Sequence, residues 1–93
     1  MYLSNEFPIK RKFIFSYIMT RDEEKYFASI GKKLRELRIK AGYSSQEGFA
    51  YAADIPRAQY ARYEKGVNVT LLSFRKILRF HKLSHSDFFK GID

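Results

Sequence analysis

The feature of the sequence that most constrains the fold is a series of apolar residues spaced alternately three and four positions apart. This spacing places every member on one face of an α-helix, whereas a strand would require alternate positions. A helix is therefore expected to begin near Asp22, which can act as its N-cap residue, and to stop at Gly42. The apolar residues of the series are Phe27, Ile30, Leu34, Leu37 and Ala41.

Four shorter helices are indicated by residues that favour helix ends. Ser44 or Ser45 caps the first of them, Thr70 caps the third and Ser84 caps the last. Pro56 fits the opening turn of the helix between them. The residues expected to face the core are Phe49, Ala50, Ala53, Leu71, Leu72, Phe74, Ile77, Leu78, Phe80, Phe88 and Phe89.

The length and composition of the chain fit one small domain. It has 93 residues, of which 45% are hydrophobic. This is enough for a single core and too little for two domains. We therefore expect an all-α domain over residues 22–93, preceded by an N-terminal arm over residues 1–21. Pro8 and the apolar alternation within residues 13–18 favour an extended conformation for the arm.

Positive charge is concentrated in the second half of the domain. The formal net charge of the chain is +8, and between residues 55 and 82 the only acid is Glu64. Such an excess favours a polyanionic partner, either nucleic acid or an anionic membrane surface. Five of the seven bases in this segment, all except Arg57 and Arg62, are expected to form a solvated face, of which one or two touch phosphate. The seven bases are Arg57, Arg62, Lys65, Arg75, Lys76, Arg79 and Lys82.

Several classes of protein are excluded or disfavoured. The chain has no cysteine, so disulfides, thiolate catalysis and cysteine zinc sites are excluded. The apolar stretch over residues 13–20 is far shorter than a membrane span, and no cleavage site follows it, so a cytoplasmic location is expected. His81 and His85 are four apart, but a helix break is expected between them, so no metal is predicted. No catalytic motif is present, and we expect neither a cofactor nor an enzyme.

Residues 45–64 predict two short helices joined by a tight turn. Small residues are needed where such helices cross, and Ala50 and Ala53 supply them. An apolar residue is needed just after the turn, and Ile55 meets that need. This arrangement predicts a helix-turn-helix unit.

The second helix of this unit carries side chains that can read bases. Arginine can donate two hydrogen bonds to guanine, glutamine can bond adenine, and alanine can touch the thymine methyl group. The alternative is that these are ordinary surface residues. The candidate base readers are Arg57, Ala58, Gln59, Ala61 and Arg62.

An ordered set of residues between positions 30 and 90 resembles the pattern of a known protein family. The set comprises Ile30, Gly31, Leu34, Arg35, Leu37, Arg38, Gly42, Ser45–Glu47, Phe49, Ala50, Ile55–Arg57, Arg62–Glu64, Gly66 and Leu72–Leu83. It resembles the phage lambda repressor and Cro-like family of helix-turn-helix regulators, often called XRE-type. The resemblance implies a five-helix lambda-repressor-like domain and a sequence-specific DNA-binding transcriptional regulator, most simply a repressor.

The resemblance also implies roles for particular residues. Gln46 corresponds to a glutamine that binds a phosphate and supports a base-reading side chain. Arg57, Ala58 and Arg62 correspond to the base-reading face. Outside that face, the resemblance implies a buried ion pair between Arg38 and Glu64. It also implies that Lys65 and Asn68, which follow the base-reading helix, approach the DNA backbone.

Three positions and the arm depart from the family pattern. Asp54 stands where glycine is usual, and Tyr60 and Tyr63 stand where smaller aliphatic residues are common. We expect both tyrosines to fill the core. The arm over residues 1–21 has no counterpart in the minimal family domain.

The expected partner is double-stranded DNA, bound by a homodimer. The dimer contact would use either the C-terminal Phe88, Phe89 and Ile92 or the arm residues Phe13, Phe15 and Tyr17. Lys10, Arg11 and Lys12 form a basic cluster that could enter the minor groove or remain a solvated turn. The alternative function is an antitoxin or protein-interaction module in which the arm binds a partner protein. A membrane-surface role for residues 10–19 is a third reading.

Overall fold

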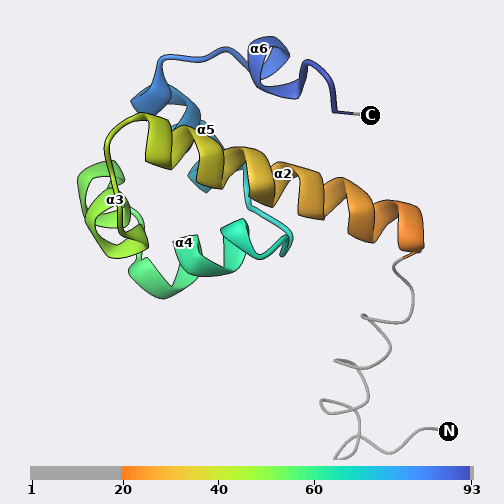
Figure 1. Cartoon of the computed structure of the whole chain (residues 1–93), viewed down its shortest axis with the longest axis horizontal. Helices are drawn as coiled ribbons and strands as arrows, with labels where there is room; N and C mark the ends of the chain where they lie inside the picture. Colours follow the sequence, from red (N-terminus) through yellow and green to blue (C-terminus); the bar gives the residue numbers. More distant parts are fainter. Residues whose placement is uncertain (1–19, 93) are drawn as a thin grey trace, which may run out of the picture.

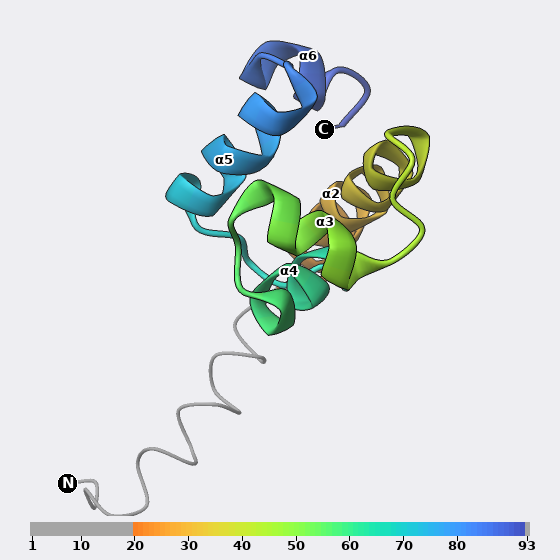
Figure 2. The same cartoon turned by 90° about the vertical axis from the view of Figure 1, so that its left-hand side faces the viewer.

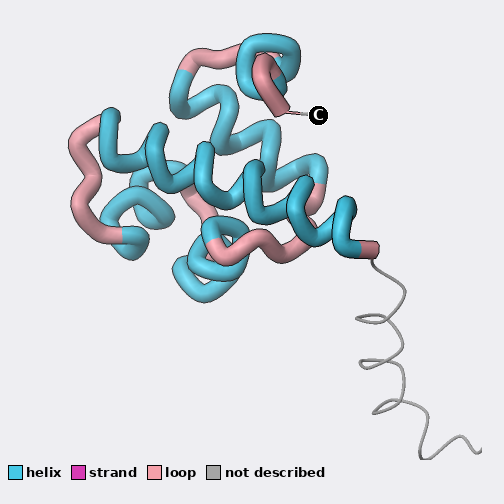
Figure 3. The backbone as a smooth tube through the Cα atoms, turned by 45° about the vertical axis from the view of Figure 1, so that its right-hand side comes forward, coloured by secondary structure: helices cyan, strands magenta, loops and turns pink. Residues whose placement is uncertain are grey.

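The computed structural model describes residues 20–92 and contains only helices there, which confirms the all-α expectation (Figure 1, Figure 3). Residues 1–19, which include most of the arm, lie outside the described part. None of the helices in residues 20–92 is both long enough and apolar enough to cross a membrane. The helices are α2 (Arg21–Lys40), α3 (Gln46–Ala53), α4 (Arg57–Glu64), α5 (Leu71–His81) and α6 (His85–Phe89).

Helix α2 begins earlier than expected because a capping box forms at Thr20. The Thr20 hydroxyl accepts a hydrogen bond from the Glu23 amide at 3.1 Å, and the Thr20 amide donates to the Glu23 carboxylate at 2.9 Å. Each residue thus satisfies one unpaired amide of the other. The expectation of Asp22 as the N-cap was therefore wrong. Asp22 lies in the first turn, where its charge favours the helix dipole.

The remaining caps largely follow the sequence. Ser45, Thr70 and Ser84 each accept a hydrogen bond from the backbone amide three residues later, as an N-cap side chain does. Asp54 ends α3 in the left-handed conformation at φ 60°. Pro56 is the N-cap residue of α4, which begins at Arg57 as expected and ends at Glu64.

The core is formed where α2, α3, α4 and α5 meet, and aromatic rings dominate it. Tyr60 and Tyr63 are both buried, which confirms that these large residues fill the core. The rings of Phe49 and Tyr60 lie 4.8 Å apart at its centre. Figure 2 looks roughly along α2, with α3 and α4 grouped against it and α5 leading to α6. The buried apolar residues are Ile30, Leu34, Phe49, Ala50, Ala53, Ile55, Tyr60, Tyr63, Phe74, Ile77, Leu78 and Phe88.

Three residues expected in the core are exposed. Leu71 and Leu72 are 81% and 68% exposed, because the first turn of α5 lies past the edge of the core. Leu71 continues the stripe of Phe74 and Leu78, but no other helix covers that end of it. Ala41 is exposed because it caps the end of α2, where the chain turns away.

The C-terminal residues divide between core and surface. Phe88 is fully buried and packs edge-on against Phe74, with ring centroids 4.9 Å apart. This corrects the expectation that Phe88 could contact a second copy. Phe89 and Ile92 are only half-buried against the core. Phe89 and Ile92 are therefore the C-terminal apolar side chains that keep part of their surface exposed.

Helix α2 approaches the end of α4 closely at Gly31. A methyl group at this position would lie 2.6 Å from the Glu64 carbonyl oxygen and 2.9 Å from the Tyr63 carbonyl oxygen and the Gly66 amide nitrogen. All three neighbours are backbone atoms, so none can rotate away. Glycine is therefore required by packing rather than by its conformational freedom.

We expect Gly31→Ala to destabilise the domain by about 1–3 kcal/mol, because the two backbones must separate to admit the methyl group. Urea unfolding followed by circular dichroism measures the loss. Ser29→Ala is the matched control, since Ser29 is exposed on the same helix, and its effect should stay within about 0.5 kcal/mol. Equal stability of the two variants would show that the contact is not tight.

Candidate nucleic-acid interface

Helices α3 and α4 form a compact pair joined by three residues. The Ile55 amide donates to the Ala50 carbonyl at 2.9 Å, which closes the end of α3. Ile55 and Ala50 are buried, and Lys76 of α5 donates to the Asp54 carbonyl at 3.1 Å. The turn is thus fixed from both sides. This geometry matches the helix-turn-helix unit expected from residues 45–64.

The outer face of α4 presents two arginines beside small residues. Arg57, Ala58 and Arg62 are exposed, and Ala61 is half-buried between the outer face and the core. Within residues 20–92, neither Arg57 nor Arg62 forms an ion pair. Their guanidinium groups are therefore available to an external acceptor. Because α4 buries Tyr60 and Tyr63, its opposite side is the only one that a ligand can reach.

Gln59 is turned toward α5 instead of joining this outer face. Its amide nitrogen donates to the Ser73 hydroxyl oxygen at 3.0 Å and also bonds the Tyr63 hydroxyl oxygen. Burial acts to raise the pKa of Tyr63, but hydrogen bonds with Ser73, Gln59 and Thr70 outweigh it and lower that pKa. The expected adenine contact by Gln59 would require these bonds to break. In the structure, Gln59 positions α4 against α5.

A buried ion pair joins α2 to the end of α4. The Arg38 Nε atom lies 2.7 Å from Glu64 Oε2, and Nη2 lies 3.3 Å from Oε1. The two side chains are only 6% and 3% exposed. Arg38 also donates to the Tyr43 carbonyl at 2.8 Å, so the loop after α2 is held by the same guanidinium. This pair forms as the family resemblance implies.

Gln46 extends the ion pair into α3. Its amide nitrogen donates to Glu64 Oε1 at 2.8 Å. A glutamine amide carries two hydrogens, so the second remains for a phosphate oxygen at the start of α3. Three helices therefore converge on one carboxylate, and the first residue of α3 is oriented by it.

The pKa of Glu64 reflects this convergence. Burial acts to raise the pKa of the carboxyl, but hydrogen bonds from Arg38 and Gln46 outweigh burial and lower it. The pKa of Arg38 is raised, chiefly by its hydrogen bond to Glu64. Burial raises the pKa of the Tyr60 hydroxyl, which stays neutral beside the pair. The site therefore holds one fixed negative and one fixed positive charge.

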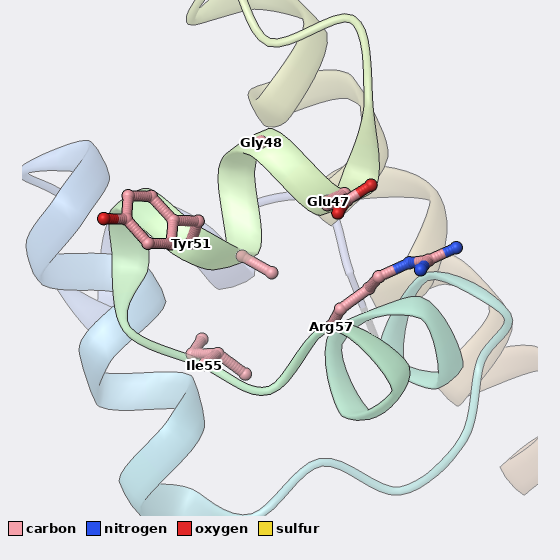
Figure 4. Close-up of a pocket in the computed structure, with 6 residues that line it drawn as sticks. Glu47, Gly48, Tyr51, Ile55 and Arg57 are labelled. Carbon is pink, nitrogen blue, oxygen red and sulfur yellow. The ribbon is translucent and has the colours of Figure 1, made fainter.

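An open groove of about 520 Å³ separates α3 from the start of α4 (Figure 4). Ala50 and Ile55 line its apolar part, and the charged ends of Glu47 and Arg57 lie on the same side of it. Tyr51 stands at its edge, 88% exposed, with a hydroxyl that could donate to a phosphate oxygen. The sequence reasoning did not single out Tyr51. The sequence signal that could have identified Tyr51 is its position: it is an aromatic residue that lies off the inward face of α3, which Phe49, Ala50 and Ala53 form.

The other basic and polar candidates lie near the loop between α4 and α5. Lys65 caps the end of α4, and both it and Asn68 are exposed. Arg75 and Arg79 are exposed on α5, whereas Lys76 approaches the Asp54 carboxylate at 3.6 Å. Lys65 and Asn68 therefore lie close along the chain to α4, and Lys76 contacts the turn between α3 and α4.

The two histidines serve packing. Lys82, in the left-handed conformation at φ 57°, ends α5 between His81 and His85, so they do not share a helix face. His81 stacks on Phe49 at 5.2 Å, and burial lowers its pKa. His85 lies against Phe74 at 5.7 Å. Among the described residues, no group of three histidine or acidic side chains is placed to hold a metal ion.

Comparison with known proteins gives one match. A family model described as helix-turn-helix matches residues 34–88, which is more than half of the chain. The matched span runs from the middle of α2 into α6 and includes the Arg38–Glu64 pair and the whole of α3 and α4. No curated protein and no solved structure matches the chain.

The stability of the domain should depend on the ionisation of Glu64. Its folded-state pKa lies below the ordinary value of 4.5, so its contribution is complete above that value and is lost as the pH falls through the folded pKa. Glu64→Gln should destabilise the domain by about 3–5 kcal/mol at neutral pH, because Arg38 is left buried without its partner.

The measurement is urea unfolding of both chains at about pH 7 and about pH 3. The gap in free energy of unfolding between them should narrow at the lower pH, because the stabilisation by the Glu64 charge decreases as the pH falls from 4.5 toward its lowered folded-state pKa. Glu36→Gln is the control, since Glu36 is exposed on α2. A gap that stays constant with pH would contradict the assigned role of the Glu64 charge.

Proposed function

The chain belongs to the lambda repressor-like helix-turn-helix family of DNA-binding transcription regulators, and we propose that it is a sequence-specific repressor that binds DNA as a dimer. In this proposal α4 enters the major groove, whose width admits an α-helix. The observation that carries it is the outer face of α4, where Arg57 and Arg62 lie exposed beside Ala58 and form no ion pair with any residue between 20 and 92.

The two arginines favour guanine as the base that is read. Arginine presents two parallel donors to guanine O6 and N7 and discriminates strongly against other bases. Ala58 and Ala61 add little bulk to the helix surface, so the backbone of α4 can approach the bases closely. Ala58 can also touch a thymine methyl group. Gln59 is left out of the reading set because it bonds Ser73 and Tyr63.

Contacts to the phosphate backbone would set the register of the helix. Gln46 stands at the start of α3, where unpaired backbone amides and the helix dipole favour an anion. Lys65 and Asn68 would contact the backbone on the other side of α4. Tyr51, at the groove between α3 and α4, is a further candidate for a phosphate bond. Such contacts position a protein on DNA without reading sequence.

Repression requires only that the bound protein block access to a promoter. Two copies would bind half-sites about 34 Å apart on one face of the duplex. Phe89 and Ile92, half-buried at the C-terminal end of the domain, are available for the contact between copies. We place the protein in the cytoplasm, where it would meet DNA. A mobility-shift assay with DNA from upstream of its own gene, with random DNA as competitor, tests the proposal directly.

Arg62→Ala should weaken binding to the specific site by about 1–3 kcal/mol and relax the preference at a single base pair. Fluorescence anisotropy against a set of single-base variants of the site measures both effects. Lys32→Ala removes the same charge from an exposed position on α2 and should leave the base preference unchanged. A uniform loss of affinity on every DNA sequence would show that Arg62 contacts phosphate only.

Binding should also depend steeply on salt, because phosphate contacts release condensed counterions. If a dimer neutralises about six phosphates, log K should fall with a slope of about −5 against log salt concentration. Lys65→Ala should make this slope shallower by about 2 per dimer, since each copy loses one phosphate contact. A slope near zero would rule out backbone binding by these residues.

A further inference from the structure

An apolar groove lies on the side of the domain where α2 begins. It has a volume of about 260 Å³ and runs between the first half of α2, the start of α5 and α6. This volume falls below the usual range for small-molecule sites, about 300–1,000 Å³, and its lining contains no Asp, Glu, Lys or Arg, with Tyr26 and His85 as the side chains that carry polar atoms. Side chains fit such a groove better than a soluble metabolite. The lining includes Tyr26, Phe27, Val69, Leu71, Phe74 and Phe89.

One exposed leucine, Leu71, lines this groove, and two further exposed apolar residues are close to it in sequence. Val67, Leu71 and Leu72 are 45%, 81% and 68% exposed. They make up three of the five large hydrophobic residues that are exposed within residues 20–92, and they are close together in sequence. Scattered single apolar residues on a surface are ordinary, whereas an exposed leucine that lines an apolar groove, as Leu71 does, favours a binding surface.

The first turns of α2 extend beyond the rest of the domain (Figure 1). None of the residues from Arg21 to Ser29 is buried, and Figure 1 shows this end of α2 projecting past the other helices. Tyr26 and Phe27 are half-buried at its base, and Tyr26 stacks on Phe89 with ring centroids 6.4 Å apart. The groove therefore lies where the helix emerges from the body of the domain. Thr20, the last residue before α2, lies between one and two helical turns from Tyr26, which lines the groove.

We propose that residues 13–19 of the same chain fold back from Thr20 and bury their apolar side chains in this groove. Six of these seven residues are apolar, with Ser16 the exception. They lie outside the described residues, and they connect to α2 with only Thr20 between. The segment and the groove are thus two apolar surfaces whose mutual burial is favourable, and they belong to the same chain.

The distances allow this contact within one molecule. From Arg21 to Phe27 the helix rises about 9 Å. Seven extended residues span up to about 25 Å, so the segment can pass alongside Tyr26 and Phe27 as far as Leu71. A tether this short holds the segment near the groove at an effective concentration of about millimolar. The same segment from a second copy has no such advantage at ordinary protein concentrations.

The absence of cysteine in the chain permits a direct test by disulfide formation. The full-length protein would carry Phe15→Cys together with Leu71→Cys in the groove. The matched control pairs Phe15→Cys with Lys25→Cys, because Lys25 is exposed on α2 outside the groove and lies nearer to the segment along the chain than Leu71. Non-reducing gels and intact mass report whether a bond forms within one chain or between two.

We expect the groove pair to form an intrachain disulfide about tenfold faster than the control pair, independent of dilution; tenfold corresponds to about 1.4 kcal/mol of contact. Equal rates would overturn the proposal. A disulfide mainly between chains, which disappears on dilution, would also overturn it and would assign the groove to a second copy.

A double-mutant cycle provides a second measurement that does not rely on cysteine. Phe15→Ser should lower the folding equilibrium constant about tenfold in the parent chain. It should have little further effect in a chain that already carries Leu71→Ser, because the two residues share one contact. Additive effects would overturn the proposal. DNA affinity, measured separately, decides the proposed function independently of this outcome.

Discussion

The structure depends most on the buried ion pair between Arg38 and Glu64. A buried carboxylate is costly unless every oxygen has a partner, and here Arg38 and Gln46 supply those partners at 2.7–3.3 Å. Because the three residues belong to α2, α3 and α4, the requirement to satisfy one charge fixes the mutual orientation of three helices. The same Arg38 guanidinium holds the loop after α2 through the Tyr43 carbonyl. The orientation of the outer face of α4 therefore follows from an interaction on its buried side.

Packing at Gly31 and the aromatic core act together with this pair. Gly31 lets α2 approach the backbone of α4 closely enough for the Arg38 side chain to reach Glu64. Tyr60 fills the space beside the pair, and its hydroxyl donates to the Leu34 carbonyl at 3.5 Å. The large tyrosines that depart from the family pattern are accommodated in this way. The core thus combines a large ring at its centre, Tyr60, with a residue that has no side chain at its edge, Gly31.

The sequence predicted the helices well because their ends are encoded locally. Ser45, Thr70 and Ser84 cap the helices expected of them, and Asp54 adopts the left-handed conformation. Thr20 was missed because a capping box needs a partner three residues later, here Glu23, and Asp22 offered a simpler cap. Leu71 and Leu72 were assigned to the core because periodicity identifies a face of a helix but not where the core ends. The bonds of Gln59 to Ser73 and Tyr63 join residues up to 14 positions apart, so no local pattern could reveal them.

Helix α4 separates two tasks along its two sides. Tyr60, Tyr63 and Glu64 hold the helix in place, and Gln59 ties it to α5, whereas Arg57, Ala58 and Arg62 contribute nothing to the core. Under the proposed function, a change at one of these three exposed positions would alter what the surface recognises at little cost in folding. A lineage carrying this fold could thus drift to new target sites through viable single substitutions, and its regulatory connections could diverge while its architecture stays constant.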